Sequence, residues 1–352
     1  MTAGEYGGVG PYLEVGPPAW LLGPLQPLVD DPAVTDVLVN GADSVWIDRG
    51  AGLESVAVEL GGEGAVRALA VRLAAAAGRR LDESRPWVDA RLPDGVRLHA
   101  VVPPVSPAGT HVSLRMLRPG RFDLAALEAA GSLPAGWNRW LAAVVASRAA
   151  FLVTGGTGAG KTTLLAALLS LVPARERLVL VEDVGELHPV HRHVVRLEAR
   201  HANVEGRGEV TLADLTRQAL RMRPDRLVVG ECRGPEVRDL LAALNTGHAG
   251  GCATMHANAA AEVPARLEAL ASTAGMSPAA VAAQAAAAFD LVLHVRRERS
   301  RRYLAEIGMV TRAASGSLLV RRAATWAGAG NVAYDDEVWA GLMGMLGLPE
   351  PP

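Results

Sequence analysis

The sequence predicts a two-domain α/β protein, in which a smaller α+β N-terminal domain precedes a domain built on a parallel sheet. Three observations lead to this prediction. The chain has 352 residues, a length that suits two domains. Its first third reads as short strands joined by tight turns, and its middle part alternates short aliphatic strands with helices. Because 50% of the residues are hydrophobic, each domain can bury a core of its own.

The α+β N-terminal domain is predicted at residues 26–118, after a flexible lead-in at residues 1–25 that is rich in Gly and Pro. Asn40-Gly41 is the turn signal of a hairpin between two strands that carry β-branched residues. The elements expected here are strands 36–39 and 45–48, a helix over about 65–77, and strands 89–92, 96–102 and 112–116.

The parallel-sheet domain is predicted at residues 137–310, after a linker at residues 119–136. Residues 311–352 form a C-terminal tail whose role the sequence does not disclose. Alternation of strands and helices predicts that ligand chemistry gathers at the carboxyl ends of the strands. The expected elements are a helix over 137–147, strands 151–154, 178–181 and 227–229, and an Ala-rich packed helix over about 279–289.

Lys161 is the only lysine of the chain, although Lys and Arg together number 35. A flexible ammonium cannot be replaced by a forked guanidinium where it must reach two phosphates at once. Its segment fits the pattern G-x-x-x-x-G-K-[ST], in which backbone N–H groups cradle phosphates and a hydroxyl takes Mg²⁺. The predicted nucleotide-binding residues are Gly155, Gly156, Thr157, Gly158, Ala159, Gly160, Lys161, Thr162 and Thr163, with Thr162 as a Mg²⁺ ligand.

Carboxylates follow two of the predicted strands. Glu182, Asp183 and Glu186 come after the second strand, where Mg²⁺, its waters and the γ-phosphate of ATP would lie. We expect Asp183 to bind Mg²⁺ and Glu182 and Glu186 to act in catalysis, while acids at this place also serve as helix caps. Glu231 ends the third strand, in the Walker B arrangement, and is predicted to order and deprotonate the attacking water.

His256 lies in a segment of small residues, 245–258, that reads as a loop and permits close approach to a ligand. We expect it to contact the γ-phosphate or to relay its presence. For His248, in the same segment, a functional role and a structural role both stay open. A metal site is disfavoured because the two histidines are eight residues apart, with no helix to place them on one face.

Arginines outside the phosphate loop can neutralise charge that develops on the transferred phosphoryl group, often across a subunit boundary. Arg217, Arg221 and Arg223 precede the Walker B strand and are candidate arginine fingers. Arg97 and Arg115 lie in the N-terminal domain and are candidate catalytic residues.

Composition excludes other classes of protein. A formal net charge of −2 argues against a broad nucleic-acid-binding surface, so no direct nucleic-acid binding is expected. Two cysteines cannot supply a disulfide framework or a four-thiolate zinc site, and reduced, buried thiols are expected. No apolar run reaches about 18 residues, so no transmembrane segment is predicted.

Taken together, the motifs resemble the TadA/CpaF branch of secretion-superfamily ATPases, which power tight-adherence (Flp) pilus assembly and are related to type IV secretion ATPases. The resemblance covers about residues 28–310. It is carried by segments 31–41, 88–97, 155–162, 181–187, 220–226, 230–236, 245–248 and 256–258.

The resemblance implies a RecA-like P-loop ATPase domain that uses ATP and Mg²⁺ within a homohexamer. It also implies that Arg97 and Arg115 reach the nucleotide phosphates, and that His256 belongs to the "His box". Inner-membrane secretion or pilus platform proteins would be its partners, at the cytoplasmic face of the membrane. The matching acids are Glu182, Asp183 and Glu186 for the "Asp box" and Glu231 for Walker B.

The sequence leaves three functions to compare. The first is an ATP-hydrolysing motor for pilus assembly or protein secretion, with a conjugation (type IV secretion) ATPase as its alternative. The second is a scaffold that binds nucleotide without hydrolysing it. The third, a small-molecule kinase, lacks an identifiable acceptor pocket and leaves the N-terminal domain without a role.

Overall fold

The computed structural model describes residues 19–50, 52–93, 95–116, 122–200, 202, 207–299 and 301–347. The chain divides into two compact units, Met1–Arg118 and Pro119–Pro352. Most of the predicted lead-in lies outside the described residues, and its last part is helical from Ala19 onward. Among the described helices, none has both the length and the apolar character needed to cross a bilayer.

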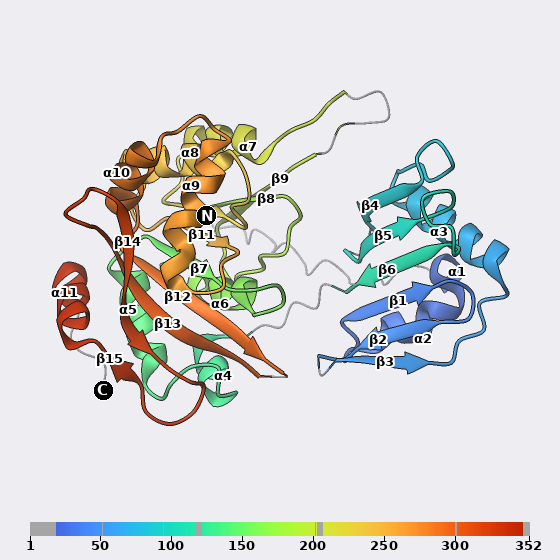
Figure 1. Ribbon diagram of the computed structural model, residues 1–352, viewed down its shortest axis with the longest axis horizontal. Helices are drawn as coiled ribbons and strands as arrows, with labels where there is room; N and C mark the ends of the chain where they lie inside the picture. Colours follow the sequence, from blue (N-terminus) through green and yellow to red (C-terminus); the bar gives the residue numbers. More distant parts are fainter. Residues whose placement is uncertain are drawn as a thin grey trace, which may run out of the picture. The chain divides into compact units, whose positions relative to one another are not determined.

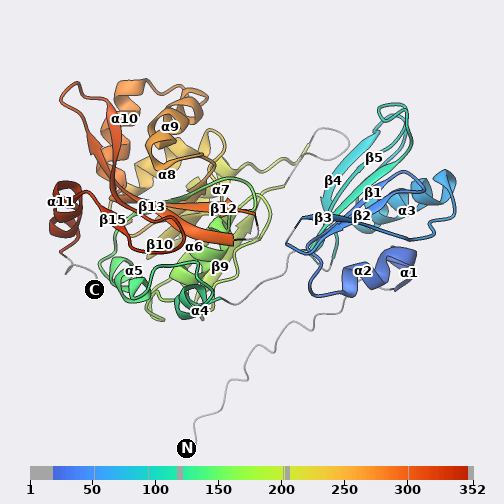
Figure 2. The ribbon, with the colours of Figure 1, turned by 60° about the horizontal axis from the view of Figure 1, so that its bottom comes forward.

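The N-terminal unit is a six-stranded antiparallel sheet in the order β3-β2-β1-β6-β5-β4, with helices packed against it (Figure 2). Alternating strand residues, such as Val37 and Val39, enter a core shared with α3. The expected strands and helix all occur, and β3 was not foreseen. The elements are α1 Ala19–Leu22, η1 Gly23–Leu25, α2 Gln26–Asp30, β1 Asp36–Asn40, β2 Val45–Asp48, β3 Leu53–Val56, α3 Glu63–Ala76, β4 Trp87–Arg91, β5 Arg97–Val101 and β6 His111–Arg115.

The second unit is built on a nine-stranded sheet in the order β15-β14-β13-β12-β7-β11-β10-β8-β9, shown in Figure 1. The strands from β12 to β9 are parallel, while β13, β14 and β15 extend the sheet in antiparallel fashion. The elements are α4 Leu124–Ala129, α5 Trp137–Ala146, β7 Phe151–Thr154, α6 Lys161–Leu169, β8 Leu178–Glu182, β9 Val194–Glu198, α7 Leu212–Ala219, η2 Leu220–Met222, β10 Arg226–Val229, α8 Glu236–Leu244, β11 Cys252–Met255, η3 Ala260–Glu262, α9 Val263–Ser272, α10 Pro278–Ala288, β12 Leu291–Glu298, β13 Arg301–Arg312, β14 Leu318–Thr325, β15 Ala333–Tyr334 and α11 Asp336–Leu346.

Helices cover both faces of this sheet, and successive strand residues belong to different cores. Phe151 and Val153 of β7 pack with α4, α5, α6 and α11, whereas Leu152 packs on the face covered by α7, α8, α9 and α10. Central parallel strands are buried on both faces, which explains why they read as continuous aliphatic runs in the sequence.

Two predicted boundaries differ from the elements observed. The predicted linker, residues 119–136, contains α4, whose Leu124 and Leu127 are buried in the core of the second unit. The boundary predicted at residue 310 falls inside β13. The segment predicted as a tail continues the sheet through β14, and α11 buries Trp339 against Trp137 and Trp140 of α5.

Candidate active site

The phosphate loop joins the end of β7, at Thr154, to the start of α6, at Lys161. Gly155 has a φ of 152°, and a Cβ added there would lie 2.3 Å from the carbonyl oxygen of Val295 on the neighbouring strand. Only glycine therefore fits at the point where the loop leaves the sheet. The N-terminal turn of α6 follows directly, and its unpaired N–H groups favour an anion.

The Lys161 side chain is folded back onto its own loop. It is buried, and its Nζ donates to the carbonyl oxygens of Gly155 at 3.2 Å and Gly156 at 3.0 Å. The same Nζ lies 3.3 Å from Nδ1 of His256. These contacts hold the ammonium against the phosphate loop and beside His256.

His256 connects Lys161 to Glu231. Its Nε2 lies 2.7 Å from Oε1 of Glu231, while Nδ1 faces the Lys161 ammonium. Because an ammonium only donates hydrogen bonds, Nδ1 must accept, and the ring proton of the neutral imidazole is assigned to Nε2. Nε2–H can then donate to the Glu231 carboxylate, so that three predicted residues form one continuous chain of contacts.

Strand order explains why these three residues meet. β11 lies between β7, which ends at the phosphate loop, and β10, which leads to Glu231. Because all three strands are parallel, their carboxyl ends share one edge, and His256 follows the end of the middle strand. The loop expected over residues 245–258 is wrong for Cys252–Met255. These residues form a fully buried central strand, and their side chains alternate between the two helix-covered faces of the sheet, with Cys252 on one face and Ala253 and Met255 on the other.

Glu182, at the end of β8, is buried and holds the following turn. Its Oε1 accepts the backbone N–H groups of Glu186 and Leu187, both at 2.9 Å. Its Oε2 is buried and has no hydrogen-bond partner among the described residues. Burial raises the pKa of Glu182 to about 7 from an ordinary value of 4.5, against the opposing effect of the two backbone donors.

The other carboxylates of this edge have different surroundings. Asp183 forms an ion pair with Arg233, from the turn after β10. Glu186 is half-buried. Glu236, which the sequence reasoning did not single out, is buried and accepts the backbone N–H groups of Arg233 at 2.6 Å and Gly234 at 2.8 Å. Glu236 therefore orders the turn that carries Arg233, the ion-pair partner of Asp183.

A pocket of about 380 Å³ lies beside the phosphate loop, and the β12–β13 hairpin forms much of its wall. Arg302 Nε donates to the carbonyl oxygen of Gly158 at 2.9 Å, which ties the hairpin to the loop. Sequence reasoning missed these residues, although the basic run 296–302 was a signal for an anion site. The lining residues are Gly156, Thr157, Ala159, Asn258, His294, Val295, Arg296, Arg297 and Arg299.

A buried polar contact supports the base of this pocket. Thr154 Oγ1 lies 3.0 Å from Nδ1 of His294, which is 1% exposed. Burial lowers the pKa of His294, although the nearby Glu306 carboxylate opposes this effect. Glu306 is itself buried, and its Oε1 lies 3.4 Å from a guanidinium nitrogen of Arg296.

The candidate arginine fingers lie outside this pocket. Arg217 forms ion pairs with Asp214 and Asp239, and Arg221 donates to the carbonyl oxygen of Arg217 at 2.9 Å. Arg223 lies just before β10, at the amino ends of the parallel strands, whereas the phosphate loop lies at their carboxyl ends. Their role as arginine fingers stays a prediction.

Arg97 and Arg115 are directly opposite each other on the paired strands β5 and β6 of the N-terminal unit. Two like charges placed across a strand pair repel each other unless an anion or a carboxylate lies nearby. The register also places Asp36 of β1 opposite Arg115 on its other side, so a carboxylate lies in the same row, and the catalytic role of the arginine pair stays a prediction.

His248, Cys232 and Cys252 lie outside the chain of contacts from Lys161 to Glu231. Nδ1 of His248 lies 3.1 Å from the carbonyl oxygen of Ala243, near the end of α8. Cys232 and Cys252 are free and buried, as expected, and burial raises the pKa of Cys252 to about 12. Within the described ranges, no three His, Cys, Asp or Glu side chains are grouped to hold a metal by themselves.

The family model described as "Type II/IV secretion system protein" matches residues 21–311. A protein of Mycobacterium tuberculosis (strain H37Rv) whose name assigns it to conjugal transfer is 57% identical over 298 residues, covering 83% of this chain and 85% of that protein. The type IV secretion system protein VirB11 of Brucella suis is 33% identical over 267 residues, covering 67% of this chain and 72% of VirB11.

Among solved structures, the pilus retraction motor PilT with bound ADP aligns with a TM-score of 0.56 at 18% identity, covering 92% of this chain and 89% of PilT. That likeness supports the fold, a RecA-like P-loop domain with a smaller α+β N-terminal domain. The family match over 21–311 and the 57% identical relative lead to one conclusion: this chain belongs to the type II/IV secretion system protein family.

Proposed function

We propose that this protein hydrolyses ATP as a motor for pilus assembly or protein secretion at the cytoplasmic face of the membrane. The observation that carries the proposal is the chain of contacts from Lys161 through His256 to Glu231. It links the residue expected to hold the phosphates to the residue expected to activate water. A protein that only binds nucleotide has no need of such a link.

The phosphate loop fits a nucleotide. Residues 155–163 supply the glycines and the helix N-terminus that phosphates require, and Lys161 would exchange its two backbone acceptors for the β- and γ-phosphates. The pocket beside the loop adds guanidinium groups from the β12–β13 hairpin.

Mg²⁺ also fits this edge of the sheet. Thr162 offers a hydroxyl at the start of α6, Asp183 offers a carboxylate, and Glu182 has a buried oxygen without a partner. Hydroxyl and carboxylate oxygens are the donors that Mg²⁺ prefers, and few are needed because phosphates and waters complete the set. When bound, Mg²⁺ would neutralise charge on the phosphate oxygens.

Glu231 is proposed as the general base, because it is half-exposed at the edge where the attacking water would lie. Glu182 is less suited to that role, since its Oε1 already accepts two backbone N–H groups. Glu186 is the remaining carboxylate that could take the proton.

His256 is proposed as a relay. When phosphates draw the Lys161 ammonium away, Nδ1 of His256 loses its donor, and the Nε2–H contact with Glu231 can adjust. The state of the phosphate site would thereby reach the residue that activates water. A direct contact between His256 and the γ-phosphate is the alternative.

Catalysis is further proposed to be completed in a homohexameric ring. Arg97 and Arg115 would reach the nucleotide phosphates, and one of Arg217, Arg221 and Arg223 would act from a neighbouring subunit. An arginine finger can contribute about three to five decades in rate. Mixing Lys161→Ala chains with Arg→Ala chains should restore activity if the finger acts in trans, and absence of rescue for all three arginines contradicts it.

The branch of the family is also part of the proposal. The motifs favour the TadA/CpaF branch and inner-membrane platform proteins as partners. The 57% identical relative named for conjugal transfer and the 33% identical VirB11 favour a second candidate, a type IV secretion ATPase that acts in conjugation.

Substitution of Glu231 by Gln tests hydrolysis against a scaffold role. The amide oxygen can still accept from His256 Nε2–H, so ATP binding should persist while turnover falls by about two to four decades. Phosphate release and nucleotide affinity are measured on the same preparation. A wild-type protein that binds ATP without turnover supports the scaffold instead, and unchanged turnover in the variant moves the base to Glu186.

A further inference from the structure

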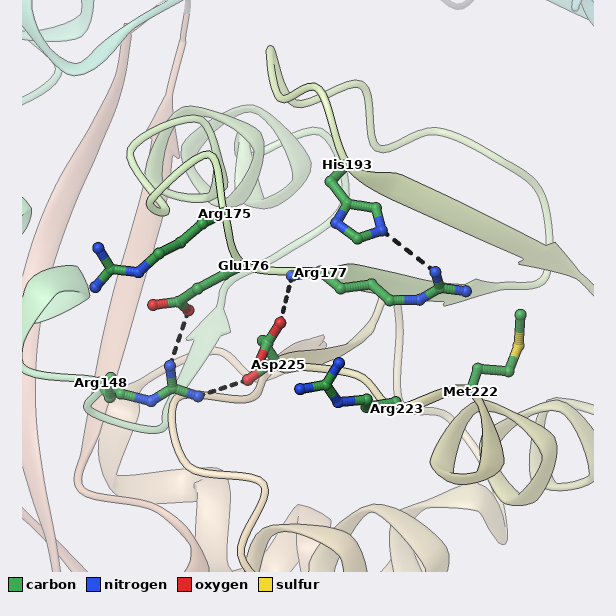
Figure 3. Close-up of a pocket in the computed structure, with 8 residues that line it drawn as sticks. All are labelled: Arg148, Arg175, Glu176, Arg177, His193, Met222, Arg223 and Asp225. Atoms are coloured by element: carbon green, nitrogen blue, oxygen red, sulfur yellow. Dashed lines mark hydrogen bonds and ion pairs between the residues drawn. The ribbon is translucent and has the colours of Figure 1, made fainter.

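Figure 3 shows a second pocket, of about 400 Å³. It lies at the amino ends of the parallel strands, whereas the phosphate loop follows the carboxyl end of β7. Its residues precede strands: Arg148 comes before β7, Arg177 before β8, His193 before β9 and Asp225 before β10. We call it the amino-edge pocket. It is lined by Arg148, Arg175, Glu176, Arg177, His193, Met222, Arg223 and Asp225.

One of the two acidic groups of the amino-edge pocket is paired with guanidinium groups. Glu176 is buried, and its Oε2 accepts from Arg226 Nε at 2.7 Å and from Arg148 Nη1 at 2.9 Å. Asp225 Oδ2 accepts the backbone N–H of Arg177 at 2.8 Å. These contacts hold the strand ends together. They account for Arg148 among the lining arginines, while Asp225 makes no ion pair within the described residues.

Three guanidinium groups are left for another partner. In the described part of the chain, the side chains of Arg175 and Arg223 make no hydrogen bond or ion pair. Arg177 Nη1 lies 3.2 Å from His193 Nε2, which must accept because a guanidinium only donates. Arg177 Nε is a buried donor with no acceptor among the same residues, so one residue of the pocket wall keeps an unpaired polar group.

Backbone conformation points to the same pocket. Arg223 has a φ of 53° and Arg148 a φ of 60°, in the left-handed region that disfavours residues with a Cβ. Arg148 is held there by hydrogen bonds to the carbonyl oxygens of Asp225 and Ala249. Within the described ranges Arg223 has no such anchor, although its side chain points toward Asp225 in Figure 3. Strain of this kind gathers at ligand sites.

We propose that the amino-edge pocket binds the phosphate or diphosphate group of a small molecule, separately from the nucleotide at the phosphate loop. Planar guanidinium forks match phosphate oxygens, and Arg177 and Arg223 reach the pocket from different segments. The volume lies in the range of small-ligand sites. A compact pocket suits such a group better than an extended acidic peptide.

The experiment uses methyl NMR of the full chain labelled with ¹³C at the methionine methyl groups. Met222 lines the amino-edge pocket, whereas Met255 ends β11 beside His256 and reports on the phosphate loop. Inorganic pyrophosphate is titrated at constant ionic strength, and Met222→Leu assigns the pocket signal. We expect a saturable shift of the Met222 signal, independent of the shift at Met255.

Matched variants identify the ligand-binding side chain. Arg223→Ala should raise the dissociation constant for pyrophosphate, measured from the Met222 signal, by about tenfold or more, because it removes charge-assisted hydrogen bonds. The dissociation constant of Arg223→Lys should lie between those of Arg223→Ala and the wild type. Arg238→Ala removes an equal charge from an exposed position on α8, outside the pocket, and should bind as the wild type does.

Three results overturn the proposal. A shift of Met255 alone places pyrophosphate only at the phosphate loop. A response of Met222 that is linear, or equal in Arg223→Ala and Arg238→Ala, shows an adventitious ion only. A saturable response to a decapeptide of glutamate, without one to pyrophosphate, assigns the pocket to an acidic protein segment. The remaining methionine signals verify that each variant is folded.

Discussion

Replacement of His256 by Ala tests the chain of contacts between Lys161 and Glu231. The change removes the acceptor 3.3 Å from the Lys161 ammonium and the donor 2.7 Å from Glu231 Oε1. Hydrogen bonds to charged groups contribute about 1.5–3 kcal/mol each. The His256 side chain is 40% exposed, so solvent weakens both contacts and the lower part of that range applies.

Turnover of the His256→Ala variant should fall by roughly tenfold to a hundredfold, which is about 1.4–2.8 kcal/mol in activation free energy. This loss is smaller than that expected for Glu231→Gln, because His256 positions the base and does not itself take the proton. Phosphate release at saturating ATP measures it. His248→Ala, on a histidine near the end of α8, is the control and should keep wild-type turnover.

The double variant decides how His256 acts. If it acts through Glu231, His256→Ala should cost little more than about twofold once Glu231 is Gln, since coupled residues give non-additive losses. Losses that add in full refute the relay and favour a direct contact between His256 and the phosphate.

Three further predictions follow from burial and close approach. Because the pKa of Glu182 is about 7 when folded, the folded chain keeps a proton that the unfolded chain loses above about pH 4.5, so stability falls between pH 5 and 8. Glu182→Gln should remove up to about 3 kcal/mol of this pH dependence in denaturant titrations, and an unchanged dependence contradicts the assignment. Gly155→Ala should lower the free energy of unfolding by about 1–3 kcal/mol, because the added Cβ meets Val295. Gly156→Ala is the control and should change it by less than about 0.5 kcal/mol, because the space there is open. Equal melting temperatures for the two variants contradict this prediction. Cys232 and Cys252 should resist a thiol reagent until the protein unfolds, and stoichiometric labelling of the native protein contradicts their burial.

Local sequence determined the parts of the site that one strand, turn and helix contain. The phosphate loop is such a part, because Gly155 and Lys161 belong to one continuous segment whose pattern fixes its conformation. The strand that leads to Glu231 is also a short apolar run, which a local pattern can indicate. Most strands of the N-terminal unit were predictable for the same reason, since Asn40-Gly41 and alternating apolar residues mark them.

Tertiary structure alone decided which distant residues meet. β11 reads as part of a loop because its segment, 245–258, has many small residues, yet its place between β7 and β10 puts His256 between Lys161 and Glu231. The burial that raises the pKa of Glu182 likewise arises from neighbours far away in the sequence. The amino-edge pocket combines residues from 148 to 225 that share no local pattern, because strand order, which depends on non-local packing, brings them to one edge.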